Sequence, residues 1–515
     1  MTLVPSGLVR SGEANRQDTS SSGATAAWRK LLRRSTTAGA ALLLVLAFVI
    51  TPSSPSGTAS AADVPRSDSA ASRTDDSVAL SSGDLAALED PNQLAFKRRD
   101  VSVGRVYPPP QLDRISVTST TSGALRLSER PSLNTRLGDR FANLTHNNNY
   151  VFYTIDPQLQ EYVTKLVGQA QASHVAVVAM NPRTGEILAI AGKSRSVPDI
   201  EYHAGFPAAS LFKVVTAAAA VEQAGIKPGS MISYRGGTYT LNEWNYIPDP
   251  RRDRQSMTVA DALGRSCNPV FGHLGSRYLN GSILTKYAQL FGFNRSIDLE
   301  APLPTSQATI PNNSLYELSR TSAGFGDVRI SPVHAAALMS GVANGGLMPR
   351  PQMIDKIVSA DGSVVHDSEP EALQRVVQPQ TAKLLMEMME HTTTIGTSRR
   401  EFMRGNRPTL GNLRVVGKTG TLKGDDPSGL NNWFIGAAPM DNPELAVAVI
   451  TVDPRYSSKA SHLARLVFQE HFNISPTPEP APSRSKYRSK KSYTKYKKPT
   501  KKSYSRASTS TKKKK

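Results

Sequence analysis

Two segments far apart in the chain carry the same β-hairpin pattern, and together they constrain the fold more than any other feature. The first is HVAVVAMNPRTGEILAIAG at 174–192, where two apolar runs flank a turn-rich stretch. The second is NNWFIGAAPMDNPELAVAVITV at 431–452, with MDNP as its turn. Such runs are typical of hairpin strands. Because the sequence between them is mostly helical and loop-like, we predict an α+β fold, in which terminal strands close an antiparallel sheet around an inserted helical lobe.

Two helices are expected beside these hairpins. Asp156-Pro157 suits the cap and first turn of a helix that leads into the first hairpin. The stretch SKASHLARLVFQEHF at 458–472 places apolar residues at helical spacing after the second hairpin. The main domain is therefore expected to run from about residue 150 to 475.

The positive charge of the chain lies mostly at its ends. Residues 483–515 hold 15 Lys or Arg and no acidic residue, and residues 1–36 contribute +4 of the net +20, so the part between is close to neutral. The last 40 residues show no apolar periodicity and are expected to be disordered. The expected organisation is a cytoplasmic basic leader (1–36), a membrane anchor or signal segment (37–52), a flexible spacer (53–95), a small N-terminal module (96–149), the main domain (150–475) and a Lys/Tyr/Ser-rich basic tail (476–515).

The apolar run from Ala38 to Ile50 sets the expected location of the protein. Arg29, Lys30, Arg33 and Arg34 precede it, so the positive-inside rule leaves the leader in the cytoplasm and the rest of the chain outside. Thirteen residues are few for a span of about 20, and Ala59-Ser60-Ala61 suits signal-peptide cleavage. The basic leader is long for a signal peptide, however, and the gap from Ile50 to Ala61 is also long, so we favour a retained single-pass anchor in the cell membrane; the alternative is a cleaved signal peptide and a secreted or periplasmic protein.

The segment FPAASLFKVVTAAAAVEQAG at 206–225 predicts one buried helix with Ser210 and Lys213 near its start. Residues three apart share a helix face. Burial disfavours the charged form of a lysine, so Lys213 can accept a proton. A serine beside such a base is an activated nucleophile.

Two further polar clusters, Ser266-Cys267-Asn268 and Lys418-Thr419-Gly420-Thr421, follow Ser-x-x-Lys in the chain. Ser-x-x-Lys, Ser-x-Asn and Lys-Thr-Gly in this order are the motifs of active-site serine enzymes of the penicillin-binding protein and β-lactamase superfamily. From about Tyr150 to Ile474, the sequence resembles a monofunctional, class B-like penicillin-binding protein. TIDPQLQ, VAMNPRTGEILAIAG and SAGFGDVRISPVHAAALMSGVANGG add to the likeness. The resemblance implies a five-stranded antiparallel sheet and a penicillin-sensitive peptidoglycan D,D-transpeptidase acting in cell-wall synthesis.

The resemblance also implies roles for the catalytic residues. Ser210 would attack the D-Ala-D-Ala carbonyl, and Lys213 would take its proton. Ser266 would relay a proton to the leaving amine, because a hydroxyl both donates and accepts. Asn268 would position Lys213 and the substrate backbone, and Lys418 would supply positive potential.

The resemblance assigns substrate binding to the third motif. Thr419 and Thr421 would donate hydrogen bonds to the terminal carboxylate, and Gly420 would let the strand approach Ser210 closely. The N–H groups of Ser210 and Thr421 would form the oxyanion hole.

No metal and no cofactor are expected. The one cysteine, Cys267, permits no internal disulfide or thiolate metal cluster, and it is expected to be a small buried filler. None of the nine histidines has HExxH spacing. Three alternatives to the transpeptidase remain open from the sequence: a D,D-carboxypeptidase, a β-lactamase, and a non-catalytic β-lactam sensor.

The expected partners are peptidoglycan stem peptides and β-lactam antibiotics, with a cell-wall synthesis complex as a further possibility. The basic tail would bind anionic envelope polymers or a membrane surface. Its interleaved Lys and Tyr also suit nucleic acid, but a tail outside the membrane meets little of it, so no nucleic-acid partner is expected.

Overall fold

The computed structural model describes residues 112–121, 123–453 and 459–475. The expected leader, anchor, spacer and basic tail lie outside these residues, as does the start of the N-terminal module. Among the described residues, no helix combines the length and apolar character needed to cross a bilayer.

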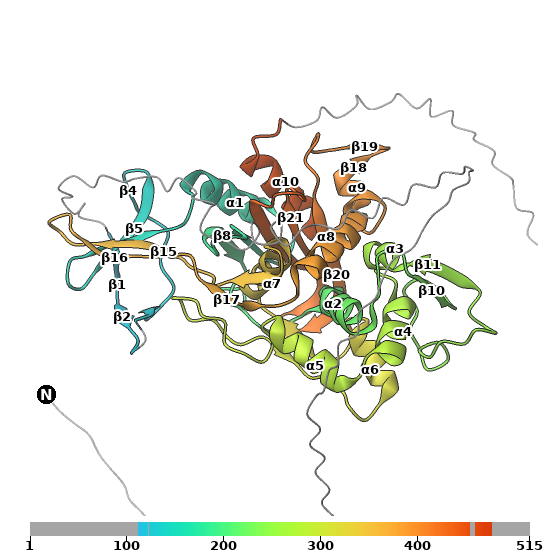
Figure 1. Cartoon of the computed structure of the whole chain (residues 1–515). Coiled ribbons are helices and arrows are strands. Elements are labelled where there is room, and N and C mark those ends of the chain that lie inside the picture. The colour runs from blue at the N-terminus through green and yellow to red at the C-terminus, as the bar shows by residue number, and fades with distance from the viewer. Residues whose placement is uncertain (1–111, 122, 454–458, 476–515) are drawn as a thin grey trace, which may run out of the picture. The chain divides into compact units, whose positions relative to one another are not determined.

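A five-stranded sheet forms the centre of the described chain (Figure 1), and every neighbouring pair in it is antiparallel. Both predicted hairpins belong to it, which confirms the prediction that both ends of the main domain close one sheet. The strands in pairing order are β20 (Val416–Asp425), β21 (Ser428–Ala438), β22 (Leu445–Asp453), β7 (His174–Met180) and β8 (Ile187–Lys193).

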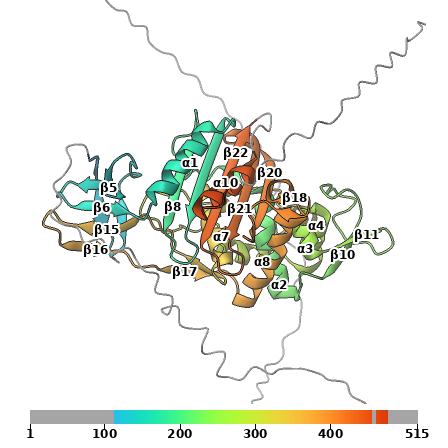
Figure 2. The same ribbon diagram turned by 90° about the horizontal axis from the view of Figure 1, so that it is seen from above.

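Both faces of the inner part of this sheet are buried, so β22 and β7 are almost wholly apolar rather than alternating with polar residues. Val175 and Val177 of β7 pack with the helices on one face, α1 (Pro157–Gln169) and α10 (Ala460–His471). Ala176 and Val178 join the core on the opposite face, where α7 (Pro332–Ala343) lies against β22 and β7. Figure 2 shows α1 and α10 beside the sheet. Side chains alternate across a strand, so each strand contributes to two cores.

The two framing helices form as predicted. Asp156 caps α1 by accepting a hydrogen bond from the Leu159 N–H, and Pro157 occupies the first helical turn. Apolar residues of α10 at helical spacing are buried against the sheet.

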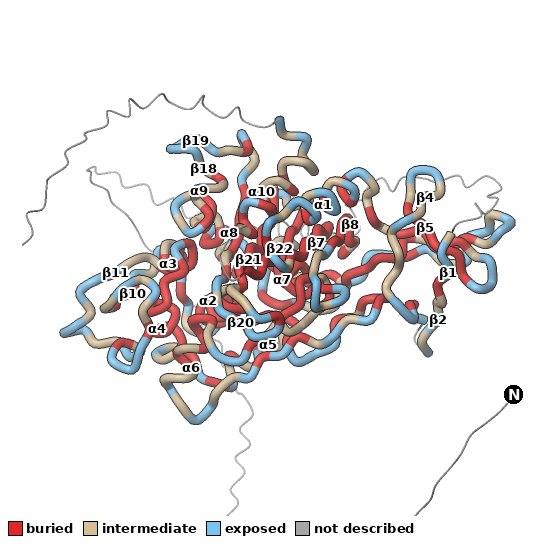
Figure 3. The backbone as a smooth tube through the Cα atoms, turned by 180° about the vertical axis from the view of Figure 1, so that it is seen from behind, coloured by how far each residue is buried: buried red, intermediate tan, exposed pale blue. Residues whose placement is uncertain are grey.

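The inserted lobe is mainly helical, but it holds more strand than the sequence indicated. Its short strand pairs are β10 (Met231–Tyr234) with β11 (Gln255–Thr258), β13 (Val328–Ile330) between β9 (Phe206–Pro207) and β12 (Gln307–Ala308), β14 (Leu347–Pro349) with β17 (Ala372–Arg375), and β18 (Met403–Arg404) with β19 (Arg407–Pro408). Its remaining helices are α2 (Lys213–Ala224), α3 (Val259–Gly264), α4 (Asn268–Tyr278), α5 (Gly281–Leu290), α6 (Leu315–Ser322), α8 (Pro379–Thr394) and α9 (Arg399–Phe402). Figure 3 shows the central strands buried and much of the β10–β11 hairpin exposed.

The prediction of a single helix over 206–225 is wrong at its start. Phe206 and Pro207 form strand β9, which pairs with β13, and a 3₁₀ turn, η3 (Ala209–Phe212), follows before α2 begins at Lys213. Ala209 has a φ of 50°, a left-handed conformation that interrupts a continuous α-helix. Gly225 ends the helix at a left-handed C-cap, as expected.

The expected boundary between residues 149 and 150 runs through a six-stranded sheet. Strand β5, from before the boundary, pairs with β6, and β6 pairs in turn with a hairpin that lies 200 residues further along the chain. The strands are β1 (Arg114–Ile115), β5 (Arg140–Thr145), β6 (Tyr150–Tyr153), β15 (Ile354–Val358) and β16 (Val364–Asp367) in pairing order, with β4 (Arg136–Leu137) on β5; β2 (Val117–Ser119) and β3 (Leu125–Leu127) form a separate pair. Residues 112–149 therefore share a sheet with the main domain.

Candidate active site

Ser210 and Lys213 lie together at the start of α2. Lys213 is the first residue of the helix and is fully buried, whereas Ser210 in η3 is half-exposed. The Lys213 Nζ lies 2.8 Å from the Ser210 Oγ. The predicted pair therefore forms, although Ser210 sits in the turn before the helix rather than on it.

Lys213 has two more partners, and both have oxygens that can only accept hydrogen bonds. Its Nζ donates to the Asn268 Oδ1 at 2.8 Å and to the Ala323 carbonyl oxygen. A neutral amine has two N–H groups and one lone pair. When the two N–H groups serve these carbonyl oxygens, the lone pair is left for the Ser210 hydroxyl proton. This is the arrangement that a general base requires.

The environment of Lys213 also favours its neutral form. Burial lowers the pKa of Lys213 from 10.5 to about 7. Among the described residues, no carboxylate lies within ion-pair distance of its ammonium. A substantial fraction of Lys213 is therefore an uncharged base at neutral pH.

A second serine–lysine pair, from Ser266 and Lys418, lies close by. The Lys418 Nζ donates to the Ser266 Oγ at 3.0 Å and to the Thr419 carbonyl oxygen at 2.7 Å. Both side chains are buried. Burial, and then the charge of Lys213, hold the pKa of Lys418 well below its usual value. Asn268, which contacts Lys213 at 2.8 Å, lies two residues after Ser266, so the two pairs belong to one site.

Left-handed backbone lies at both motif serines. Ser266 has a φ of 58° between α3 and α4, and Ala209, immediately before Ser210, has a φ of 50°. Such a conformation costs a non-glycine residue about 1–3 kcal/mol and persists where the surrounding structure enforces it. Strain of this kind is often concentrated at active sites, which agrees with the placement of these residues.

Asn268 begins α4, and its amide has a defined orientation. The Asn268 Nδ2 donates to the Tyr239 carbonyl oxygen at 2.8 Å, and the backbone N–H of Asn268 donates to the Thr238 carbonyl oxygen at the same distance. Because the Tyr239 carbonyl can only accept, the Asn268 oxygen must face Lys213.

The third motif lies on β20, an edge strand of the central sheet. A Cβ added to Gly420 would come within 3.2 Å of the Ala208 carbonyl oxygen and 3.3 Å of the Ala209 Cβ. Glycine therefore permits the close approach of β20 to the turn that carries Ser210. As an edge strand beside the nucleophile, β20 offers its outer backbone groups to an extended peptide.

The hydroxyl groups of the third motif are held but retain donor capacity. The Asn432 Nδ2 donates to the Thr421 Oγ1 at 3.1 Å, which leaves the Thr421 proton available. The Thr419 Oγ1 lies 2.6 Å from the Thr397 Oγ1. The Thr397 hydroxyl also lies 3.3 Å from the Gly264 carbonyl oxygen, so its one proton serves either that oxygen or Thr419, and the Thr419 proton is available to a carboxylate in the second case.

The loop after α6, which contains Gly324, packs beside Lys213. Gly324 has a φ of 89°, and a Cβ there would lie 2.3 Å from the Ala209 carbonyl oxygen. Only a residue without a side chain lets this loop pack against the turn before Ser210 and present the Ala323 carbonyl to Lys213. The roles of Ala323 and Thr397 were not predicted. The SAGFG stretch belongs to a segment that resembles the family, but a backbone contact such as that of Ala323 leaves no mark of its own in the sequence.

Other residues singled out in the sequence have structural surroundings. Cys267 is fully buried, and burial raises the pKa of its thiol to about 11, as suits a packed side chain. Trp433 packs edge-on against Phe206 and donates from its indole to the Pro207 carbonyl. Within the described ranges, no three His, Cys, Asp or Glu side chains cluster as metal ligands.

Comparison with known proteins gives a consistent result. The family model "Penicillin binding protein transpeptidase domain" matches residues 175–472, more than half of the chain. The chain is 28% identical over 397 residues to the peptidoglycan D,D-transpeptidase PbpA of Mycobacterium tuberculosis, covering 67% of this chain and 78% of that protein. It is also 28% identical over 329 residues to stage V sporulation protein D of Bacillus subtilis, covering 59% and 49%.

Solved structures share the fold. The crystal structure of PBPA from Mycobacterium tuberculosis matches with a TM-score of 0.52 and 25% identity, over 64% of this chain and 83% of that one. The D,D-transpeptidase domain of a peptidoglycan glycosyltransferase from Eggerthella lenta matches with a TM-score of 0.53 and 22% identity, over 69% and 94%. These likenesses confirm the predicted α+β fold. With the family match over residues 175–472, they establish that the chain belongs to the penicillin-binding protein transpeptidase family.

Proposed function

We propose that the protein is a peptidoglycan D,D-transpeptidase that cross-links stem peptides through an acyl-enzyme on Ser210. One observation carries the proposal: Lys213 is buried between two carbonyl oxygens, with Ser210 as its third partner. That arrangement makes an activated serine nucleophile. The named relative PbpA is a peptidoglycan D,D-transpeptidase.

The first half-reaction forms the acyl-enzyme. Lys213 takes the Ser210 proton as the Oγ attacks the carbonyl carbon of the penultimate D-Ala. The peptide C–N bond then breaks, and the terminal D-Ala leaves as an amine after receiving a proton through Ser266. In the second half-reaction, an acceptor amine attacks the acyl-serine, loses a proton to the site and releases Ser210.

Substrate recognition is assigned to the third motif. The terminal carboxylate of the donor peptide would accept hydrogen bonds from Thr419 and Thr421, near the positive potential of Lys418. Neither Lys213 nor Lys418 has a carboxylate partner among the described residues. No side-chain carboxylate in this part of the chain therefore competes with the substrate's carboxylate for these lysines. Gly420 keeps β20 close to Ser210, so the donor can extend along the strand edge.

β-Lactams are proposed as ligands that acylate the same serine. A solved structure of penicillin-binding protein A from Mycobacterium tuberculosis is an imipenem acyl-enzyme complex. For this chain the proposal rests on the Ser210–Lys213 geometry. We expect no metal or cofactor to take part in the reaction.

Domain organisation and location are also proposed. The transpeptidase domain spans residues 150–475, with 96–149 as a small N-terminal module, of which residues 112–149 share a sheet with it. Residues 1–36 form the cytoplasmic leader, 37–52 the anchor, 53–95 the spacer and 476–515 the basic tail, which would bind anionic envelope polymers or the membrane surface. The catalytic domain would face outward and act within a cell-wall synthesis complex.

The test uses the purified full-length chain, a thioester donor that mimics acyl-D-Ala, and a D-amino acid acceptor. A product that forms only with the acceptor is expected, and Ser210→Ala should abolish it. Ser256→Ala, an exposed serine on β11, serves as the matched control and should match the parent. Release of hydrolysed donor alone would identify a D,D-carboxypeptidase instead. Rapid turnover of penicillin would identify a β-lactamase, and a single acylation by penicillin without any reaction of the thioester donor would indicate a sensor.

A further inference from the structure

The loop between β10 and β11 is tied to the active site through Asn268. We use the name strap for residues 235–245 of this loop. The strap meets α4 at two places: Asn268 binds the Thr238 and Tyr239 carbonyls in the first turn, and His273 binds the strap's far end in a later turn. Between them, Leu241 packs onto Gly272, where a Cβ would lie 2.8 Å from its side chain.

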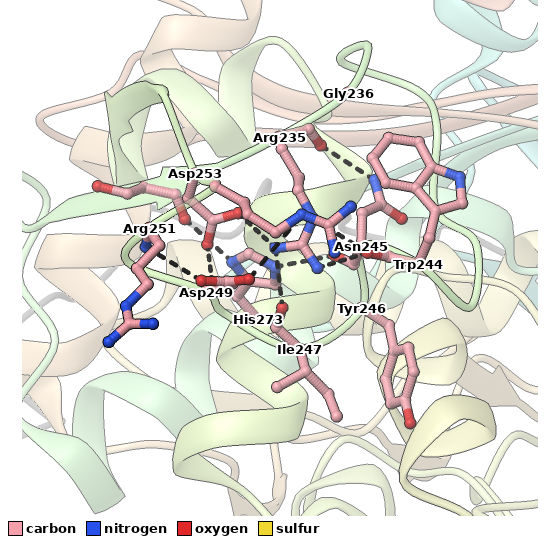
Figure 4. Close-up of polar contacts among 12 residues, drawn as sticks. Arg235, Gly236, Trp244, Asn245, Tyr246, Ile247, Asp249, Arg251, Asp253 and His273 are labelled. Carbon is pink, nitrogen blue, oxygen red and sulfur yellow. Dashed lines mark hydrogen bonds and ion pairs between the residues drawn. The ribbon is translucent and has the colours of Figure 1, made fainter.

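Asn245 closes the strap on itself. Its side chain is fully buried, and its Nδ2 donates to the Arg235 and Thr240 carbonyls, both at 3.0 Å. Its Oδ1 accepts from the Asn242 N–H at 2.7 Å. One side chain thus satisfies three backbone groups of a loop that has no regular hydrogen-bonding ladder, and it fixes the loop's path. Figure 4 shows this amide beside Gly236 and Trp244.

His273 joins the closed strap to α4. The ring is almost completely buried, with its Nε2 2.9 Å from the Asn245 carbonyl oxygen and its Nδ1 3.0 Å from the Ser233 carbonyl oxygen. Figure 4 shows His273 lying under the loop. A neutral imidazole carries one N–H and donates to one of these carbonyls, and the tautomer with its proton on Nε2 binds the end of the strap.

We propose that Asn245 and His273 are positioning residues for acylation: they hold the Thr238–Tyr239 backbone so that the Asn268 amide keeps its oxygen toward Lys213. This inference rests on the proposed function of Ser210 and Lys213. Without a fixed Tyr239 carbonyl, the Asn268 amide is free to rotate. An N–H group turned toward Lys213 would compete with Ser210 for the lone pair of the amine.

The first test measures the second-order rate constant for penicillin acylation of the full-length protein. Asn245→Ala should lower it by about tenfold, since small misplacements of reacting groups cost rate steeply. Asn245→Asp keeps the size of the side chain but turns an oxygen toward two carbonyls, so it should also be slow. Glu243→Gln, at an exposed position on the same strap, is the matched control and should match the parent.

A double-mutant comparison separates positioning from general stabilisation. If Asn245 acts through Asn268, then adding Asn245→Ala to Asn268→Ala should lower the rate no further, because the two residues share one path. His273→Gln keeps a donor able to reach the Asn245 carbonyl and should retain most activity. His273→Phe, which keeps a ring without donors, should resemble Asn245→Ala.

A readout independent of turnover is the titration of Lys213 in the resting protein, followed by NMR of labelled lysine side chains. Loss of the Asn268 acceptor disfavours the ammonium, so Asn245→Ala and Asn268→Ala should both shift the titration of Lys213 downward. An unchanged titration, or an equal loss of rate in both backgrounds, would overturn the proposal. Failure of the parent to react with penicillin would instead refute the proposed function, and the titration would still test the strap.

Discussion

The site contains two serine–lysine pairs that look alike in sequence but differ in their surroundings. Both lysines are fully buried, and both pKa values are lowered by burial. Lys213 has two carbonyl oxygens besides its serine, whereas the contacts of Lys418 include one. Ser210 is half-exposed, whereas Ser266 is buried. In the proposed mechanism, the more exposed serine attacks the substrate and the buried serine relays the proton.

The largest expected effect comes from removing the first lysine. Lys213→Met fills a similar volume without a base, so acylation by penicillin should fall by about 10³-fold, within the range for loss of a general base. The rate is measured by rapid mixing with a fluorescent penicillin. A loss of less than about tenfold would show that another group takes the Ser210 proton.

The pH dependence of acylation distinguishes the pairs next. Lys213 must be neutral to accept a proton, and its pKa is about 7. The rate should therefore rise with pH through this value, with about 50-fold less activity at pH 5 than at pH 7 from the change in free base alone. Lys418→Met should keep this rising limb. If the rising limb of the pH profile disappeared in Lys418→Met, the titrating group would be Lys418 rather than Lys213.

Removing the second lysine should cost less. Lys418→Met leaves the Ser210–Lys213 contact intact but takes away the partner of Ser266 and the positive potential. We expect the rate of acylation to fall by about 30-fold, because losing the proton relay and the positive potential should slow the reaction less than losing the general base. Ser266→Ala in the Lys418→Met background should add little. Fully additive losses would show that the two residues do not act as a pair.

The smallest expected effect tests the Gly324 loop, which packs beside the Ser210–Lys213 pair. Gly324→Ala would push a Cβ against the Ala209 carbonyl and displace the turn before Ser210, so acylation should fall by about tenfold. Gly345→Ala carries the same left-handed penalty in open space and is the control; it should lower stability by about 1 kcal/mol without slowing acylation. Equal acylation rates in both variants would show that the Gly324 loop does not position Ser210.

Prediction from sequence succeeded where side chains carry the information. The two hairpins, the helices at 157–169 and 460–471, and all three motifs have patterns that local chemistry explains. The start of α2 was misplaced because the left-handed conformation of Ala209 is enforced by tertiary contacts with β20 and the Gly324 loop. An alanine in a run of helix formers gives no sign of that.

Backbone contacts and distant pairing account for the rest. The Ala323 and Tyr239 carbonyls shape the environment of Lys213 and Asn268, yet any residue could supply a carbonyl at those positions. The sheet that joins β5 and β6 to β15 depends on a hairpin more than 200 residues away. Short strands with so large a separation cannot be paired from local patterns.

Identification of the acylated residue tests the central claim most directly. The full-length protein would be treated with penicillin, digested, and its adduct located by tandem mass spectrometry. The account predicts one modified residue, Ser210, with Ser266 unmodified, and it predicts no adduct at either serine in Ser210→Ala. An adduct on Ser266 in the parent protein would contradict the division of roles between the two pairs.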